Sequence, residues 1–341
     1  MDIPSVSNDE AEIGRYLCNY LSEVAERSDG CVEQMKVEGE RFNAFAHWGE
    51  PLVTLSTHMD TVPPFFPSRE DGEEIWGRGA CDAKGIIACM MAAAEKLLNE
   101  GTRNFGLLFV VGEERNSAGA VAASQAPQGS RYLVNGEPTE NKLALGSKGT
   151  LRFEVTSHGR AAHSAYPEMG ESAIDALLDV LASLRQVSLP EDALLGRGTM
   201  NIGTIRGGQA PNVIADFAQA EILVRLVGDT DPVRTAFSSA AGNRARLKEV
   251  LCIPAMRFEA LDGFATMVAS YSTDAPILAG AWGKPLLIGP GSIHVAHTLE
   301  ERVSKKELSD AVEIYAGVVR RLLGRLQENA AEAAGYQARV Y

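Results

Sequence analysis

The chain has 341 residues, 45% of them hydrophobic, which is enough for one large domain and a smaller one. Its 32 basic and 45 acidic residues give a formal net charge of −13, which argues against nucleic acid or an anionic membrane as a partner. The five cysteines form no Cys-x-x-Cys pair, and neither a signal-peptide pattern nor an apolar run of membrane-spanning length is found. These features predict a soluble, cytoplasmic protein.

The first part of the chain alternates between short apolar strands and helical segments, a pattern typical of an α/β fold with a mostly parallel sheet. A helix is predicted over residues 85–99, before Gly101. A second helix is expected from Lys305 to about Glu328, with a frayed tail after it. Buried strands are predicted at residues 52–55, 107–111, 132–134 and 286–288.

The pattern changes near Gly149. Helices are predicted over residues 171–187 and 233–250, and strands over residues 151–156, 200–205, 215–227 and 253–259. The resulting β-α-β-β-α-β order is that of a ferredoxin-like unit. We therefore predict a catalytic domain made of residues 1–148 and 260–341, with a ferredoxin-like α+β domain, residues 149–259, inserted into it.

Acidic and imidazole side chains follow the predicted strands of the first domain, where each strand ends. Because ligands collect at the carboxyl ends of strands in open α/β sheets, these side chains are expected to converge on one crevice. Asp82 opens the helix after the first of these strands and reaches the same edge. The other members of the set are His58, Asp60, Glu113, Glu114, Glu137 and His297.

Carboxylates packed together raise one another's pKa unless cations neutralise them. Two imidazoles and several carboxylates suit one or two divalent ions such as zinc, cobalt or manganese, and two such ions activate water and polarise a carbonyl. Each residue alone has a structural alternative: Asp82 could cap its helix, and Glu113 and Glu114 could be a solvated pair. Their joint placement favours a metal site.

Other chemistries fit less well. Gly77 and Gly79 could begin a dinucleotide-binding loop, but Asp82 occupies the third glycine position. The chain has no phosphate-binding Gly-Lys-Ser/Thr motif and no Gly-x-Ser-x-Gly nucleophile elbow. Cys81 could be a nucleophile, although a small apolar filler is the simpler interpretation.

Together these motifs resemble the M20 family of metallopeptidases, which includes aminoacylases, acetylornithine deacetylases, succinyl-diaminopimelate desuccinylases and carboxypeptidases. The resemblance covers almost the whole chain. It rests on His-x-Asp-Thr-Val-Pro at 58–63, Gly-Arg-Gly-x-x-Asp-x-Lys-Gly at 77–85, Glu-Glu at 113–114 with Ser-Ala-Gly at 117–119, Gly-Glu-Pro-Thr at 136–139, and Gly-Pro-Gly-Ser at 289–292 with Ala-His at 296–297.

The resemblance implies a zinc-peptidase-like catalytic domain that binds two divalent metal ions, zinc first, with cobalt or manganese as alternatives. Asp82 would bridge the ions, with Glu114 and His297 on one ion and His58 and Glu137 on the other. Asp60 would orient the ring of His58. Glu113 would be the general base. The peptide bond after Asp82 is expected to be cis.

The inserted domain would be the family's lid and dimerisation domain, so a homodimer is expected. His163, in a Gly-Arg-Ala-Ala-His-Ser segment, would reach the partner's site and steady the oxyanion, although a surface histidine is the alternative. Asn212 and Arg225 would contact the substrate, with Arg225 suited to a carboxylate but equally plausible as a solvated strand charge. Gly291 and Ser292 would offer donors to the same carboxylate.

These inferences predict a metal-dependent hydrolase of N-acyl amino acids that bear a free carboxylate. Residues 271–276 and 289–293 look most like acetylornithine deacetylase and its acetyl-lysine and acetyl-citrulline relatives, which would place the enzyme in arginine or lysine biosynthesis. A dipeptidase, a carboxypeptidase or a succinyl-diaminopimelate desuccinylase would use the same residues. A catalytically inactive metal- or ligand-binding module is the non-enzymatic alternative.

Overall fold

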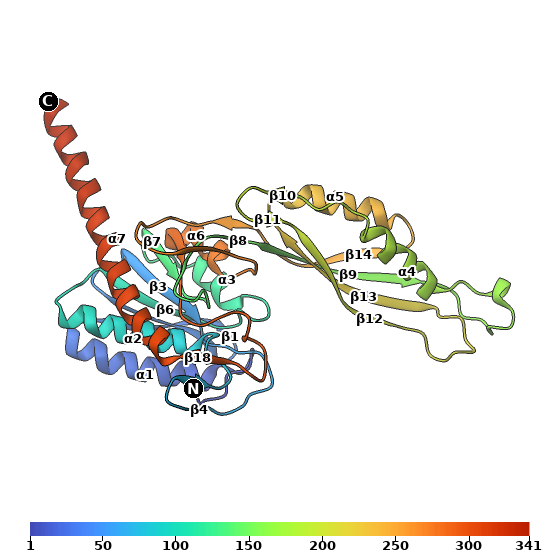
Figure 1. Cartoon of the computed structure of the whole chain (residues 1–341), viewed down its shortest axis with the longest axis horizontal. Coiled ribbons are helices and arrows are strands. Elements are labelled where there is room, and N and C mark those ends of the chain that lie inside the picture. Colours follow the sequence, from blue (N-terminus) through green and yellow to red (C-terminus); the bar gives the residue numbers. More distant parts are fainter. Residues whose placement is uncertain (341) are drawn as a thin grey trace. The chain divides into compact units, whose positions relative to one another are not determined.

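The computed structural model describes the backbone of residues 1–340 and the side chains of residues 1–331. The chain divides into two compact units (Figure 1). Unit 1 comprises Met1–Leu145, Phe258–Met267 and Thr273–Tyr341, and unit 2 comprises Gly146–Arg257 and Val268–Ser272.

Unit 1 is built on a sheet whose strands run in the order β1-β2-β6-β3-β7-β17-β8. Its centre is parallel, since β3 pairs in parallel with β6 and β7, and β17 with β7. The predicted mostly parallel sheet is therefore confirmed. The sheet strands of this unit are β1 (Cys31–Glu38), β2 (Arg41–Trp48), β3 (Val53–His58), β6 (Phe105–Val110), β7 (Tyr132–Asn135), β8 (Leu143–Ser147), β16 (Thr266–Ala269) and β17 (Lys284–Leu287). A small separate sheet holds β4 (Arg69–Glu70), β5 (Glu74–Trp76) and β18 (Arg302–Ser304).

Helices cover both faces of this sheet, which explains why its central strands β3 and β6 are buried along their whole length (Figure 1). One face packs against α1 (Ala11–Ser28), α2 (Lys84–Asn99) and α7 (Lys305–Val340). The other face packs against α3 (Ala118–Ser124) and α6 (Ala275–Trp282). A sheet buried on both faces leaves its strand ends as the natural place for polar chemistry.

Unit 2 has the β-α-β-β-α-β order, with an antiparallel sheet in the order β12-β13-β9-β14. Two helices pack on one face through a separate apolar core. The elements are β9 (Gly149–His158), α4 (Ala173–Leu184), β12 (Thr199–Gly207), β13 (Phe217–Leu226), α5 (Thr230–Ala241) and β14 (Arg246–Ile253), with the short η1 (Pro167–Met169), β10 (Glu191–Asp192), β11 (Gly196–Arg197) and β15 (Met256–Arg257). Strand β12 lies at the edge of this sheet.

One helix prediction in unit 2 was wrong. The segment 233–250 was expected to be a single helix, but α5 ends at Ala241 and the chain returns as β14 from Arg246. Gly242, with φ of 56°, follows the last helical residue, and a glycine in this conformation ends a helix without steric cost. The predicted strand at 253–259 is displaced accordingly, since most of it follows β14.

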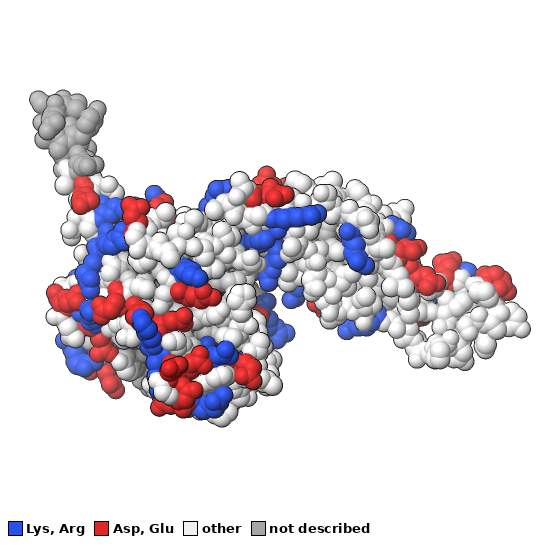
Figure 2. Space-filling view, viewed as in Figure 1, with Lys and Arg blue, Asp and Glu red and all other residues white. Residues whose placement is uncertain are grey.

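The C-terminal helix was also predicted too short. Helix α7 continues to Val340, whereas a frayed tail was expected beyond Glu328. Alanine, the commonest residue of the segment after Glu328, is the strongest helix former and favours continuation of the helix there. None of the helices described is both long enough and apolar enough to cross a bilayer. On the face drawn in Figure 2, acidic and basic side chains are intermixed over unit 1.

Candidate active site

The predicted metal ligands of unit 1 converge where its parallel strands end. His58 is the last residue of β3, Glu113 and Glu114 follow β6, and Glu137 follows β7. Two loops complete the cluster. Asp82 precedes α2, and His297, whose φ is 64°, lies between β17 and β18.

Asp82 joins two groups of ligand atoms. In the first group, its Oδ1 lies 2.8 Å from Nε2 of His58, and Glu137 completes a buried set with them. In the second group, its Oδ2 lies 3.3 Å from Nε2 of His297, which is 2.7 Å from Oε1 of Glu114. Within each group the ligand atoms lie within 4.8 Å of one another. One carboxylate thus presents an oxygen to each of two adjacent three-residue sets.

The cluster is crowded with buried charge. Burial and the negative charge of Glu137 raise the pKa of Glu113 well above its ordinary value. Burial also raises the pKa of Glu137 well above its ordinary value. Burial lowers the pKa of His58, but the neighbouring carboxylates of Asp60 and Asp82 outweigh it and raise the pKa overall. Hydrogen bonds to Asp82 and Glu114 raise the pKa of His297 to about 10.

These residues fit divalent cations. Glu137 is 4% exposed, and its Oε1 atom is buried without a hydrogen-bond partner among the described residues. A buried, unpartnered carboxylate oxygen is costly unless a cation or a proton satisfies it. Two positive ions would compensate the excess of carboxylates over imidazoles, and the nitrogen and oxygen donors match zinc, cobalt or manganese.

Asp60 organises the loop that carries both glutamates. Its carboxylate accepts hydrogen bonds from the backbone N–H groups of Glu113, at 3.0 Å, and Glu114, at 3.2 Å, and from the hydroxyl of Ser7, at 2.7 Å. The ring Nδ1 of His58 lies 3.0 Å from the backbone carbonyl of Asp60 and 3.5 Å from its carboxylate. The predicted contact with His58 is therefore made more closely by the backbone of Asp60 than by its side chain.

In unit 2, His163 and Asn212 lie on neighbouring loops. The N–H of Ser164 donates to the carbonyl of Asn212 at 3.0 Å, and His163 forms a β-bridge with Val213. His163 is exposed, and its Nδ1 accepts a hydrogen bond from the N–H of Ala165 at 3.1 Å. The loop thereby fixes the ring so that Nε2 remains available as a donor.

Arg225 lies at the other end of the same sheet. It is eight residues beyond Phe217 along β13, which corresponds to about 27 Å. Its guanidinium donates to the hydroxyl of Thr150 at 2.7 Å. Within one chain, Arg225 and the loop that carries His163 and Asn212 are therefore too far apart to touch the same small molecule.

Gly291 and Ser292 have other hydrogen-bond acceptors in unit 1. The N–H of Gly291 donates to Glu307 at 3.0 Å, and the hydroxyl of Ser292 donates to Glu140 at 3.2 Å. A substrate carboxylate would have to compete with these two glutamates for the predicted donors.

Comparison with known proteins identifies the family. The sequence model of peptidase family M20/M25/M40 matches residues 54–321, which include every predicted metal ligand. The chain belongs to this family. As a member of it, the protein is a hydrolase that acts on amide bonds.

Relatives of similar sequence agree with this assignment, and a solved structure matches the fold. A peptidase M20 domain-containing protein of Schizosaccharomyces pombe is 37% identical, over 94% of this chain and 82% of that protein. A probable carboxypeptidase of Aspergillus oryzae is 36% identical, over 94% of this chain and 87% of that protein. The fold matches an M20 family metallo-carboxypeptidase of Sulfolobus solfataricus with a TM-score of 0.75, at 15% identity, over 92% of this chain and 95% of that one.

Two further carboxylates lie beside this M20 site, and neither was predicted from the sequence. Glu301 is 1% exposed and accepts hydrogen bonds from Arg78, from the N–H of Gly79 and from the N–H of Asp82. Asp274 is 1% exposed, and burial raises its pKa to about 7. The peptide bond between Asp82 and Ala83 is cis, as the resemblance implied. Glu301 belongs to none of the recognised motifs, so only its burial in the fold reveals it.

Proposed function

We propose that this chain is a two-metal carboxypeptidase, which hydrolyses the amide bond next to a free carboxylate. The observation that carries the proposal is the pair of ligand sets that share Asp82. Support for the peptidase type comes from the A. oryzae relative, a probable carboxypeptidase that matches this chain over most of both lengths. We infer zinc as the metal, with cobalt or manganese able to replace it.

His58 and Glu137 would hold one ion, and Glu114 and His297 the other, with Asp82 between them. A pair of divalent ions supplies a water of lowered pKa and a polarised substrate carbonyl. Glu113 stands beside both sets, and its raised pKa makes its carboxylate a stronger base, which suits it to accept a proton. Glu113 would take a proton as the water oxygen bonds to the carbonyl carbon, and return it to the nitrogen as the C–N bond breaks.

The general-base role is tested by Glu113→Gln, which keeps the shape of the side chain but cannot accept the proton. We expect kcat to fall by about 10²–10⁴-fold. The bound-metal count, measured by elemental analysis, should stay at the wild-type value. Glu313→Gln, in an exposed ion pair with Lys96, is a matched control outside the cluster. A variant that retains wild-type turnover would refute the assignment, and loss of metal would make Glu113 a ligand instead.

We also propose that the enzyme acts as a homodimer through unit 2, with His163 and Asn212 completing the site of the partner. Support comes from the separation of about 27 Å along β13, because one chain cannot bring Arg225 and His163 to the same small substrate. An isologous pair of chains could do so. Strand β12, at the sheet edge, would be available for pairing with a second copy.

Mixing two inactive variants tests the shared site. A dimer of one Glu113→Ala chain and one His163→Ala chain has one site with both residues intact only if His163 serves the partner. After subunit exchange, activity should recover to about one quarter of the wild-type value, since half of the dimers are mixed and one site in two is intact. No recovery despite a mixed dimer, detected by differential tagging, would place His163 outside the partner's site.

Hydrolysis of N-acyl amino acids is the second candidate, favoured by residues 271–276 and 289–293, which resemble acetylornithine deacetylase. Both reactions cut an amide bond beside a free carboxylate, so one panel separates them. The zinc- or cobalt-loaded enzyme would be assayed for amine release from dipeptides and from the N-acetyl derivatives of ornithine, citrulline and lysine, with N-succinyl-diaminopimelate included. Hydrolysis confined to one acyl amino acid would overturn the carboxypeptidase assignment. Silence across the panel would refute both substrate classes.

A further inference from the structure

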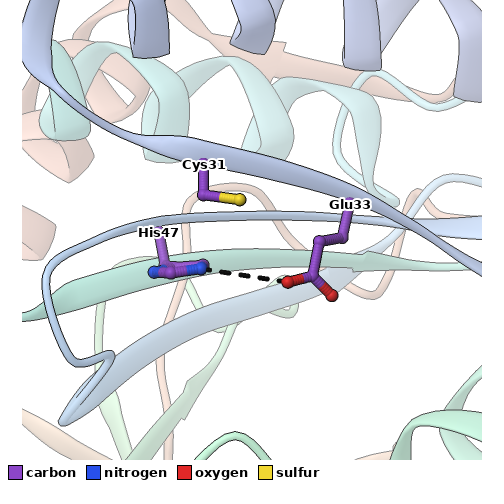
Figure 3. A group of neighbouring side chains, drawn as sticks. All are labelled: Cys31, Glu33 and His47. Carbon is purple, nitrogen blue, oxygen red and sulfur yellow. Dashed lines mark ion pairs between the residues drawn. The ribbon is translucent and has the colours of Figure 1, made fainter.

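Three potential metal ligands lie together on the edge of the unit 1 sheet, apart from the active-site cluster. Cys31 and Glu33 are two residues apart on β1, so their side chains project from the same face. On the paired strand β2, His47 stands directly opposite Cys31 (Figure 3). A thiol, a carboxylate and an imidazole therefore meet on one face of an antiparallel pair, with their ligand atoms within 4.8 Å of one another.

The ring of His47 is held in the orientation of a metal ligand. Its Nδ1 lies 2.8 Å from the backbone carbonyl of Gly49, and because a carbonyl only accepts, Nδ1 carries the hydrogen. The lone pair of the neutral ring is then on Nε2, which faces Glu33 at 4.0 Å from Oε1. The ring also stacks on the buried ring of Phe45, with centroids 5.3 Å apart. A hydrogen bond from the second ring nitrogen is the usual support of a ligating histidine.

From this arrangement we propose a third cation site, in which Zn²⁺ is bound by the thiolate of Cys31, Nε2 of His47 and the carboxylate of Glu33. In a tetrahedral zinc site, bonds of about 2.0–2.2 Å to nitrogen and oxygen hold those two atoms about 3.4 Å apart, so the 4.0 Å between Nε2 and Oε1 would close by about 0.6 Å when an ion binds. Three protein ligands leave the fourth tetrahedral position to water. The ion would tie the edge strand β1 to β2.

This site is distinct from the active-site cluster in place and in chemistry. His47 pairs with Gly106, near the start of β6, whereas Glu113 and Glu114 follow its end. Gly106 and Val110 alone are about 13 Å apart along the strand. The ligand sets of the active site contain only histidine and carboxylates, whereas the edge site contains a thiol.

The thiol provides a signal that the active site cannot produce. The full-length protein, stripped of metal and kept reduced with a phosphine, would be titrated with Co²⁺. A Co²⁺–thiolate bond gives a charge-transfer absorption in the near ultraviolet, so the wild type should develop this band and Cys31→Ser should not. Cys252→Ser, in unit 2, is the matched control and should keep the band. Adding Zn²⁺ should abolish it.

Zinc stoichiometry and affinity provide the second measurement. Cys31→Ser should bind one zinc ion fewer per chain than the wild type, with unchanged amide hydrolysis. Glu33→Gln, at an exposed position, should raise the Kd of the thiolate-bound Co²⁺ by at least ~10-fold. Loss of a residue that only supports a metal ligand already lowers metal affinity by about that factor, and Glu33 is proposed as a ligand itself. A wild type without the band, a band that survives Cys31→Ser, or equal zinc counts would overturn the proposal. These readouts do not depend on turnover, so failure of the proposed peptidase activity would leave this test intact.

Discussion

The buried ion pair beneath Asp82 allows a stability prediction with a defined magnitude. Arg78 and Glu301 are each 1% exposed, with Nη1 and Oε2 2.5 Å apart. Burial raises the pKa of Glu301 despite this partner, so the pair is expensive to bury and each charge depends on the other. Glu301→Gln removes one charge and leaves the guanidinium of Arg78 uncompensated. We expect the free energy of unfolding to fall by about 3–5 kcal/mol, the usual cost of breaking a buried pair.

Urea unfolding followed by circular dichroism would measure this loss. The control is Glu313→Gln, which breaks the solvent-exposed pair of Lys96 and Glu313 and should cost about 0–1 kcal/mol. The double variant Arg78→Met, Glu301→Gln removes both charges, while Gln keeps an acceptor for the N–H groups of Gly79 and Asp82, and it should lose less stability than Glu301→Gln alone. A loss in Glu301→Gln no larger than that of the control, or a double variant worse than the single one, would refute the reasoning.

Three further predictions concern the active-site cluster. Glu137→Ala should abolish binding of one of the two active-site ions, as counted by elemental analysis, and a full count would remove Glu137 from the ligand set. Asp60→Asn places an amide donor against the N–H groups of Glu113 and Glu114, which now donate to the carboxylate. The free energy of unfolding in urea should fall by about 1–3 kcal/mol. Unchanged stability would contradict the role of Asp60. In the metal-free protein, burial raises the pKa of Asp274 from 3.8 to about 7, so the native state retains a proton that the unfolded chain has released. The free energy of unfolding of the metal-free protein should therefore fall as pH rises from about 4 to 7. Urea unfolding of the chelated protein would refute this if the free energy rose over the same pH range.

The central strands of unit 1 were predicted correctly from the sequence. These strands are buried on both faces, so their largely apolar composition identifies them as strands of the core. Because they run in parallel, His58, Glu113 and Glu137 come to lie at one edge of the sheet. The two helix errors had opposite causes, since a stop signal ends α5 early, whereas α7 continues past Glu328 into a segment of high helix propensity. Gly242 ends α5, and the chain returns as β14 from Arg246, in a segment that was predicted to be helical up to residue 250.

Interactions between distant segments could not be predicted in this way. Glu301 lies more than 200 positions from the backbone it supports near Asp82, and no periodicity links the two segments. The separation of Arg225 from His163 likewise depends on the direction in which β13 runs in its sheet. A motif identifies residues that are candidates for a site, but only the topology determines which of these residues can reach the same ligand.

The position of Asp60 accounts for the different surroundings of the paired glutamates Glu113 and Glu114. Its carboxylate accepts from the N–H groups of both Glu113 and Glu114, so the two adjacent side chains leave a backbone held at one point. Glu114 then reaches His297 and the second ligand set, while Glu113 stands beside His58 and close enough to Glu137 for its charge to raise the pKa of Glu113. Because Asp60 also lies against His58, a shift of this one carboxylate would displace a ligand of each set together with the proposed base. We infer that its complete burial serves the relative placement of these three groups more than the orientation of a single histidine ring.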